Sequence, residues 1–381
     1  MDNNTDHLYK IIADDLIKKI NTGELDKKIG TEKELAGKYD VSRSTIRQAL
    51  KELEKLGLIK RLLGKGTFVN ELSANSNKLP AKPERVIAVI VPVISQDFIG
   101  DIITGIQEMT SERGYRINLS LTDNSVEKEK KYLREACENN VAGIILHPTN
   151  FHYYNEVVCE AIKRLPLIMT ARYYRYLNCN YVVPDNYRGA YNAAQYLIDQ
   201  GHVKIGLVSD KPLIQTSIED RIKGFMDCLL DNEMVISGQR MLTELNDPCK
   251  LYSPNMAKQE QDHINAKIKE YLQINADMSA VFAINDFIGT EIVLMAKHLG
   301  IKVPENLSIV SFDNVKMSTK IDPPLTTINW SQLEIGRTAA KELIKIIENG
   351  KKEDLTVQKV LPTNLVVRKS SKSKEGCDSR R

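Results

Sequence analysis

Polar and aromatic side chains recur at the ends of the β-prone runs in the C-terminal part of the chain. They are Asp97, Phe98, His147, Arg172, Tyr173, Asn285, Asp286 and Asp313. Carboxylates and arginines can hold neighbouring hydroxyl groups bidentately, while an aromatic ring covers the apolar C–H face of the same ligand. With the single tryptophan, Trp330, as a further candidate ring, this set indicates a site for a small polyhydroxylated molecule. Structural explanations exist too: a lone tryptophan is usually core, and Asp286 could cap the helix predicted up to Leu299.

The sequence carries no motif of a common enzyme class. H-E-x-x-H, G-x-S-x-G and G-x-G-x-x-G do not occur, and GKGT at 64–67 lacks the spacing of a phosphate-binding loop. Six histidines show no metal-ligand spacing, and six cysteines lie 20 or more residues apart without a C-x-x-C pair. We therefore expect no catalytic residues, no metal and no cofactor, and we interpret the cysteines as mostly buried, reduced thiols.

A second group of residues that could do chemistry lies near the N-terminus, where the excess positive charge is found. The whole chain has a net charge of only +3, yet residues 38–65 carry eight basic side chains against three acidic ones. Most charge runs are simply solvated helix faces. A basic run also suits the phosphates of nucleic acid, because each neutralised phosphate releases counterions. The elements that carry these charges decide between the two interpretations.

The spacing of apolar residues predicts a small helical domain that ends in a hairpin. After a first helix of about 14 residues, Thr31 and Glu34 match a capping box at the start of a second helix. Ser42 can cap a third helix with one apolar and one cationic face, and β-prone runs over 58–69 predict a hairpin with a basic tip. This order predicts a winged helix-turn-helix, in which Arg43 and Arg47 suit guanine edges in the major groove.

This segment resembles the GntR-type winged-helix domain over nearly all of residues 6–71. The matching stretches are TEKELA at 31–36, VSRSTIRQAL at 41–50, LEKLGLI at 53–59 and GKGTFV at 64–69. The resemblance implies contacts to double-stranded DNA from Lys33, Ser42, Arg43, Ser44, Thr45 and Arg47, with Gly64 and Lys65 at the wing. Two positions depart from the family: Gly30 stands where proline is usual, and Lys33 where arginine is commoner.

A polar stretch over 70–84 with two prolines separates this part from a much larger one. β-prone runs then alternate with helical stretches, at 86–91, 117–121, 143–146, 167–169, 205–208, 280–284 and 309–312. Such alternation predicts parallel sheets covered by helices, and a body of about 290 residues exceeds a single core, so we expect two lobes. Ligands of open α/β sheets bind beyond the carboxyl ends of the strands, where the polar and aromatic residues listed above are found.

Residues 84–369 resemble the LacI/GalR-type regulatory domain, which is similar to periplasmic sugar-binding proteins. The motifs are GHVKIG at 201–206, RIKGF at 221–225, AIND at 283–286, LSIVSFD at 307–313, PPLTTI at 323–328 and LVVR at 365–368. The resemblance implies two lobes joined by three crossovers, with ligand between them and contacts from Arg221, Asn285 or Asp286, Asp313 and Trp330. Ala171 and the aromatic stretch 173–176 depart from the family pattern.

The expected fold is therefore multidomain, a small α+β winged helix followed by an α/β two-lobed domain. We expect a winged helix over 1–72, a linker over 73–84, a two-lobed domain over 85–369 and a disordered basic tail over 370–381. Lobe one should comprise about 85–184 and 331–356, and lobe two about 186–329 and 357–369.

The chain thus combines a GntR-type N-terminal domain, here called the head (residues 1–72), with a LacI-type regulatory domain, here called the body (residues 85–369). This combination is typical of arabinose-responsive repressors. The resemblance implies a homodimeric, cytoplasmic repressor that binds an inverted-repeat operator and is released by a sugar, most simply L-arabinose. Another pentose, a hexose or a nucleoside remains open, and a sugar-processing enzyme or a transport component is the alternative class. The most apolar run, 86–94, contains Pro92 and is far shorter than the roughly 20 residues of a membrane span, and no export signal is apparent.

Overall fold

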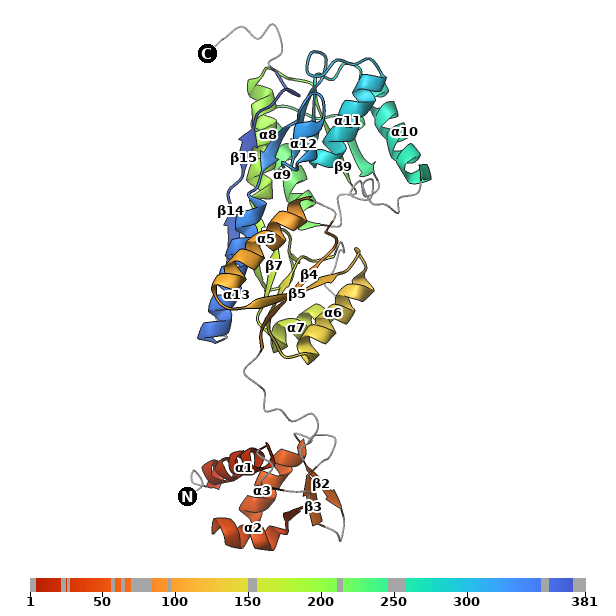
Figure 1. Ribbon diagram of the computed structural model, residues 1–381. Helices are drawn as coiled ribbons and strands as arrows, with labels where there is room; N and C mark the ends of the chain where they lie inside the picture. The colour runs from red at the N-terminus through yellow and green to blue at the C-terminus, as the bar shows by residue number, and fades with distance from the viewer. Residues whose placement is uncertain are drawn as a thin grey trace. The chain divides into compact units, whose positions relative to one another are not determined.

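Figure 1 shows the computed structural model of the chain, which forms two compact units, Met1–Pro83 and Glu84–Arg381. The structure describes residues 5–21, 25, 28–55, 59–62, 66–69, 84–94, 97–149, 156–210, 215–245, 258–350 and 356–372. No helix within these ranges is long and apolar enough to cross a membrane.

The N-terminal unit has the order expected of a winged helix. Its helices are α1 (Thr5–Asn21), α2 (Glu32–Tyr39) and α3 (Arg43–Lys55). A three-stranded antiparallel sheet has the order β1 (Lys28–Gly30), β3 (Gly66–Val69) and β2 (Ile59–Leu62). The predicted hairpin is thus confirmed as β2 and β3, while β1 was not predicted, because three residues give no periodic signal. The apolar face of α3 is fully buried in the core of this unit, as predicted.

Local hydrogen bonds fix the starts of α2 and α3. The Glu34 backbone N–H donates to the Thr31 hydroxyl at 3.2 Å and the Thr31 N–H to the Glu34 carboxylate at 2.7 Å, which confirms the predicted capping box. The Ser42 hydroxyl accepts from the Thr45 N–H at 3.2 Å and so caps α3, as predicted. Just before α2, Gly30 has φ of +107°, a conformation closed to proline, whose ring fixes φ near −65°. Glycine, which lacks a Cβ atom, adopts this conformation readily.

Lobe one of the C-terminal unit is a six-stranded parallel sheet between two pairs of helices (Figure 1). Its strands, in spatial order, are β14 (Gln358–Leu361), β8 (Asn180–Pro184), β7 (Leu167–Thr170), β6 (Val141–Leu146), β4 (Glu84–Val91) and β5 (Arg116–Leu121). Helices α6 (Val126–Glu138) and α7 (Glu156–Arg164) cover one face, and α5 (Asp97–Glu112) and α13 (Gln332–Asn349) the other. Helices α5 and α13 cross in close contact at Gly105 and Gly336, where an added Cβ would lie 2.1 Å from a backbone oxygen of the other helix.

Lobe two contains a second six-stranded sheet, in which only the last pair is antiparallel. The spatial order is β10 (Met241–Leu245), β9 (Ile205–Asp210), β11 (Ala280–Ala283), β12 (Ser308–Phe312), β13 (Thr326–Asn329) and β15 (Asn364–Val366). Helices α8 (Asn186–Asp199) and α9 (Thr216–Asp231) pack together on one side, and α10 (Lys258–Ile274), α11 (Asp286–His298) and the short α12 (Met317–Lys320) lie on the other. All seven strands predicted for the body are confirmed, and β8, β10, β13, β14 and β15 are additional.

The chain crosses between the lobes three times, from β8 to α8, from β13 to α13 and from β14 to β15. The predicted boundary between 356 and 357 is wrong, because residues 358–361 pair in parallel with β8 and so belong to lobe one. The third crossover therefore lies at 362–363. The four residues of β14, of which three are exposed, do not alternate between polar and apolar, so nothing in the sequence indicated which sheet they would join.

The predicted disordered tail begins too early. Ser370 is fully buried, donates to the Ile309 carbonyl at 2.6 Å and accepts from the Thr326 N–H at 2.8 Å. The His202 ring bonds to the Ser279 hydroxyl and to the Lys372 carbonyl, at 3.0 and 3.1 Å. Residues 370–372 are therefore part of lobe two, and the rest of the predicted tail, 373–381, lies outside the described residues.

Candidate functional site

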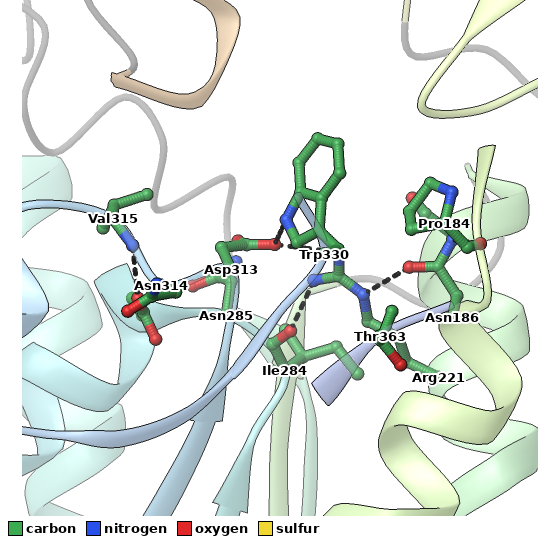
Figure 2. A network of polar contacts seen from close by, with 12 residues as sticks. Pro184, Asn186, Arg221, Ile284, Asn285, Asp313, Asn314, Val315, Trp330 and Thr363 are labelled. Atoms are coloured by element: carbon green, nitrogen blue, oxygen red, sulfur yellow. Dashed lines mark hydrogen bonds and ion pairs between the residues drawn. The ribbon is translucent and has the colours of Figure 1, made fainter. Parts of the chain in front are cut away.

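A buried arginine connects several candidate site residues of lobe two (Figure 2). Arg221, on α9, donates from Nε to Asn186 Oδ1 at 2.9 Å, from Nη1 to the Ile284 carbonyl at 2.8 Å and from Nη2 to Asp313 Oδ1 at 2.9 Å. Its guanidinium carbon lies 3.7 Å from the centre of the Phe312 ring. Only 7% of the Arg221 side chain is exposed. Arg221 thus ties the first crossover, the end of β11 and the end of β12 together.

Asp313 is the acceptor at the centre of this network. Its Oδ1 atom accepts from Arg221 and, at 3.1 Å, from the Trp330 indole N–H (Figure 2). Its carbonyl accepts from the Gln332 side chain, and its φ is +115°. Burial raises the pKa of Asp313, and the Arg221 guanidinium opposes that shift. The structure therefore brings the three predicted residues Arg221, Asp313 and Trp330 into one hydrogen-bonded group.

Asn285 and Asp286 lie together but point to different partners. Asn285, not Asp286, is the N-cap of α11, because its Oδ1 accepts from the Ile288 N–H at 2.9 Å. The Asp286 carboxylate accepts from Ser311, from Thr327 and from the Val315 N–H, at 2.5, 2.6 and 2.8 Å. It is fully buried beneath the loop that carries Asp313. The capping role suggested for Asp286 is thus wrong, and its three bonds make it a support for Asp313.

Aromatic rings from both lobes meet beside Asp313. Phe98, in the first turn of α5, lies 5.8 Å from Trp330 and 6.3 Å from His147, measured between ring centres. His147 follows β6, is buried, and its Nδ1 has no hydrogen-bond partner among the described residues. Burial and the nearby positive charge of Arg172 hold the pKa of His147 well below its usual value, so its ring is neutral at pH 7. Asp97 begins α5, but its side chain lies outside the described part of the chain.

The segment after β7 carries the remaining two predicted residues. Ala171 has φ of +63°, and the Arg172 N–H donates back to the Thr170 carbonyl at 2.7 Å. The Tyr173 ring stacks on Tyr181, with centres 4.1 Å apart. The charge of Arg172 acts on His147. The Tyr173 ring, in contrast, packs against a neighbouring ring of lobe one.

Asn186 is a further candidate site residue, which the sequence analysis did not include. It accepts from Arg221 at the first crossover and is buried. The signal was available in the β-prone residues 181–183, because the residue after a strand of an α/β sheet is a candidate in its own right. That run is only three residues long and was not recognised as a strand.

The predicted DNA-contacting residues of the head differ in exposure. Lys33, Ser42, Arg43, Ser44 and Arg47 are exposed around the starts of α2 and α3. Thr45 is buried, with its hydroxyl 2.8 Å from that of Ser42. Arg47 forms a forked pair with Glu32, at 3.0 Å from Nη2 and 3.3 Å from Nε to Oε2. Gly64 and Lys65, at the predicted wing tip, lie outside the described residues.

No cluster of described residues has the composition of a metal site. Cys179 and Cys228 are buried, Cys137 and Cys159 are partly buried, and all four are free thiols. Burial raises the pKa of Cys179 to about 11 and that of Cys228 to about 12, so neither is a reactive thiolate at neutral pH. Cys249 and Cys377 lie outside the described residues.

Comparison with known proteins supports both parts of this architecture. Residues 8–69 match the bacterial regulatory proteins of the gntR family, and residues 194–371 match the periplasmic binding protein-like domain. The chain is 29% identical over 363 residues to the arabinose metabolism transcriptional repressor of Halalkalibacterium halodurans, covering 92% of each chain. It is 30% identical over 314 residues to the HTH-type transcriptional regulator DegA of Bacillus subtilis, covering 80% of this chain and 87% of that protein.

A solved structure agrees with these matches. A LacI family transcriptional regulator from Enterococcus faecium with bound ribose has a TM-score of 0.62 and 26% identity, covering 76% of this chain and 100% of its own. Both resemblances inferred from the sequence are thus confirmed. The chain belongs to the bacterial transcriptional repressors in which a gntR-family DNA-binding domain precedes a periplasmic-binding-protein-like regulatory domain.

Proposed function

We propose that this protein is a cytoplasmic repressor of sugar-utilisation genes that binds operator DNA through its head and is released by a sugar bound to its body. L-Arabinose is the simplest candidate effector, because the domain pairing is shared with arabinose metabolism repressors that match this chain over nearly their whole length. Catalysis forms no part of this function, which requires only binding and a change of conformation.

The observation that carries the sugar part is the group formed by Arg221, Asp313 and Trp330 beside two further rings. Within the described part of the chain, both side-chain bonds to the Asp313 carboxylate end on Oδ1. A carboxylate can accept about four hydrogen bonds, so Oδ2 can accept from ligand hydroxyl groups. The faces of Phe98 and Trp330 can cover the C–H side of a pyranose or furanose ring.

Neutral His147 contributes a further polar group without a competing charge. An uncharged imidazole has one N–H donor and one acceptor nitrogen, and a sugar hydroxyl can satisfy either. The Nδ1 atom of His147 lies in the protein interior without a partner among the described residues, and a bound hydroxyl would satisfy it and remove the cost of an unpaired buried group. Arg172, whose charge acts on His147, is a further candidate for contact with the ligand.

The DNA part of the proposal rests on the exposed start of α3. In a winged helix the N-terminal residues of the recognition helix approach the base edges, and Arg43, Ser44 and Arg47 occupy that region here. Arg47 is held by Glu32 in the free protein. A homodimer would present two such helices to the half-sites of an inverted repeat, with the wing residues Gly64 and Lys65 reaching the adjacent minor groove.

Release follows if sugar binds one arrangement of the lobes better than the arrangement that holds the two heads in register. The Arg221 network is placed to link the two events, because it joins the Asp313 site to Asn186 at the first crossover. A difference in sugar affinity between the two arrangements of about 1–3 kcal/mol would give a useful response.

The test is calorimetry of the purified chain with a panel of pentoses, hexoses and nucleosides, followed by release of an operator fragment. We expect binding of L-arabinose and loss of operator affinity on its addition. Binding of a different sugar with the same release would keep the mechanism and change the effector. Absence of binding by every member of the panel, or turnover of a sugar with ATP, would contradict the proposal.

A further inference from the structure

The segment between β7 and β8 makes contacts on both sides of the lobe boundary. Residues 171–179 follow the carboxyl end of β7, and the aromatic stretch within them departs from the family pattern. This segment differs from the three crossovers in the way it connects the lobes. The crossovers are continuous chain, whereas this segment joins the lobes by side-chain and backbone hydrogen bonds.

On the lobe-one side, the segment is anchored to a buried carboxylate. The Tyr174 hydroxyl donates to Glu129 Oε1 at 3.2 Å, and only 7% of Tyr174 is exposed. Glu129, on α6, is fully buried and its Oε2 accepts from the Thr149 N–H at 2.6 Å. The Glu129 carboxylate therefore fixes the segment after β7 and the loop after β6 in one arrangement.

On the lobe-two side, the neighbouring residues bond to the first two turns of α9. Arg175 donates from Nη2 to Asp220 Oδ1 at 2.6 Å and lies 3.4 Å from Glu219 Oε2. The Thr216 hydroxyl accepts from the Tyr173 N–H at 3.3 Å and donates to the Tyr173 carbonyl at 3.1 Å. These contacts exist only while the start of α9 lies against the segment, so a relative shift of the lobes must break them or change them.

We propose that Arg175 and Asp220 form a latch that stabilises the arrangement of the lobes in which the effector is enclosed, and so set effector affinity. The two residues are positioning residues, because their bonds go to each other. The inference rests on the proposed function in one respect, namely that the effector binds between the lobes. The Thr216 hydroxyl completes the latch through its two bonds to the Tyr173 backbone. The hydrogen bond from Tyr174 to Glu129 holds the segment to lobe one.

The size of the effect follows from exposure. The Arg175 and Asp220 side chains are 39% and 26% exposed, so solvent screens the pair and its contribution is that of a partly exposed ion pair. Loss of the latch favours lobes that stand apart, where a ligand keeps the contacts of one lobe only. We expect the Kd for effector to rise about two- to fivefold in Arg175→Gln or Asp220→Asn, mainly through faster dissociation.

A matched control exists within lobe one. Arg337 on α13 pairs with Glu108 on α5 at 2.8 Å, with exposures of 41% and 44%, but both residues belong to the same lobe. Arg337→Gln removes a similar ion pair without touching the lobe boundary. This variant should bind the effector with the wild-type Kd.

The experiment measures L-arabinose binding and dissociation for the full-length wild type, both single latch variants, the double variant and Arg337→Gln. The double variant should resemble either single variant, since each already removes the same interaction. High salt should bring the wild-type Kd toward that of the variants. A Kd for Arg175→Gln equal to that of the wild type, or single effects that multiply in the double variant, would overturn the proposal.

A second measurement separates this proposal from the identity of the effector. Hydrogen exchange of ligand-free protein reports on residues 171–177, whose Tyr173 amide is bonded across the boundary. Exchange there should be about two- to fivefold faster in Arg175→Gln and unchanged in Arg337→Gln. Unchanged exchange in Arg175→Gln would refute the latch even if sugar binds, and faster exchange would support it even if L-arabinose does not bind.

Discussion

Replacement of Arg221 by methionine is the most informative perturbation of the candidate effector site. The change keeps much of the side-chain volume and removes the guanidinium. It leaves Asp313 as a buried carboxylate without its cation, and it leaves the Ile284 carbonyl without the donor that bonds it at 2.8 Å. Both the stability of the body and the effector site should respond.

The expected loss of stability can be worked out from these contacts. Breaking a buried ion pair by removing one partner costs about 3–5 kcal/mol, and the loss of the hydrogen bond to a buried carbonyl adds about 1 kcal/mol. Adding Asp313→Asn removes the stranded charge, so the double variant should recover about 2 kcal/mol relative to Arg221→Met. Neither Arg221→Met nor the double variant should bind the effector.

The assay uses the single tryptophan of the chain. Trp330 donates to Asp313, so urea unfolding followed by its fluorescence reports on the body and on this network, and circular dichroism provides an independent probe. Without Arg221 the pKa of Asp313 rises further, so the difference between variant and wild type should shrink as the pH is lowered from 8 to 5. A loss below about 1 kcal/mol at pH 8, or a double variant less stable than Arg221→Met, would refute the reasoning.

Three further predictions concern other parts of the chain. Arg47→Ala should lower the preference for operator over random DNA by about 1–3 kcal/mol, whereas Lys51→Ala on the exposed side of α3 should weaken both equally; competition binding distinguishes the two outcomes. Gly30→Pro should destabilise the head by more than about 1 kcal/mol, because φ of +107° is closed to proline, and a wild-type melting curve with full operator affinity would contradict this. Burial and the nearby Asp313 charge raise the pKa of Asp286 to about 7, above the value near 4 of an unfolded chain. The folded state then holds a proton that the unfolded chain has lost, so the contribution of Asp286 to the free energy of unfolding falls by about 2–3 kcal/mol between pH 5 and pH 8. In Asp286→Asn the free energy of unfolding should depend less on pH. An equal pH dependence of wild type and Asp286→Asn across this range would exclude the effect.

Interactions between neighbours in the sequence were predictable, and their residues show why. The capping box of Thr31 and Glu34 and the cap at Ser42 each join residues three positions apart, so backbone geometry alone brings them together. The seven predicted strands of the body follow from β-prone runs between helical stretches in the same way. Asn186 and β14 were not recognised, because a short strand beside a crossover has no periodic pattern of its own.

Contacts between distant residues could be assigned only by type. Arg221 and Asp313 were both candidates for ligand contact, but nothing in the sequence indicated that they bond to each other across 92 positions. Asp286 was equally plausible as a ligand contact or a helix cap. The structure turns its carboxylate toward Ser311, Thr327 and Val315, because the end of β11 lies between β9 and β12 in the sheet.

The two-part architecture, the cationic helix of the head and the chemical types of residue beyond the strand ends could all be inferred from local patterns in the sequence. These features depend on periodicity, local capping and the order of elements, which are properties of short stretches of chain. The folded chain was needed to see which candidates bond to one another and how residues 171–179 connect the lobes. Those properties depend on which strand ends and helix starts lie together in the folded chain, and burial there determines whether a charge is paired or available to a ligand.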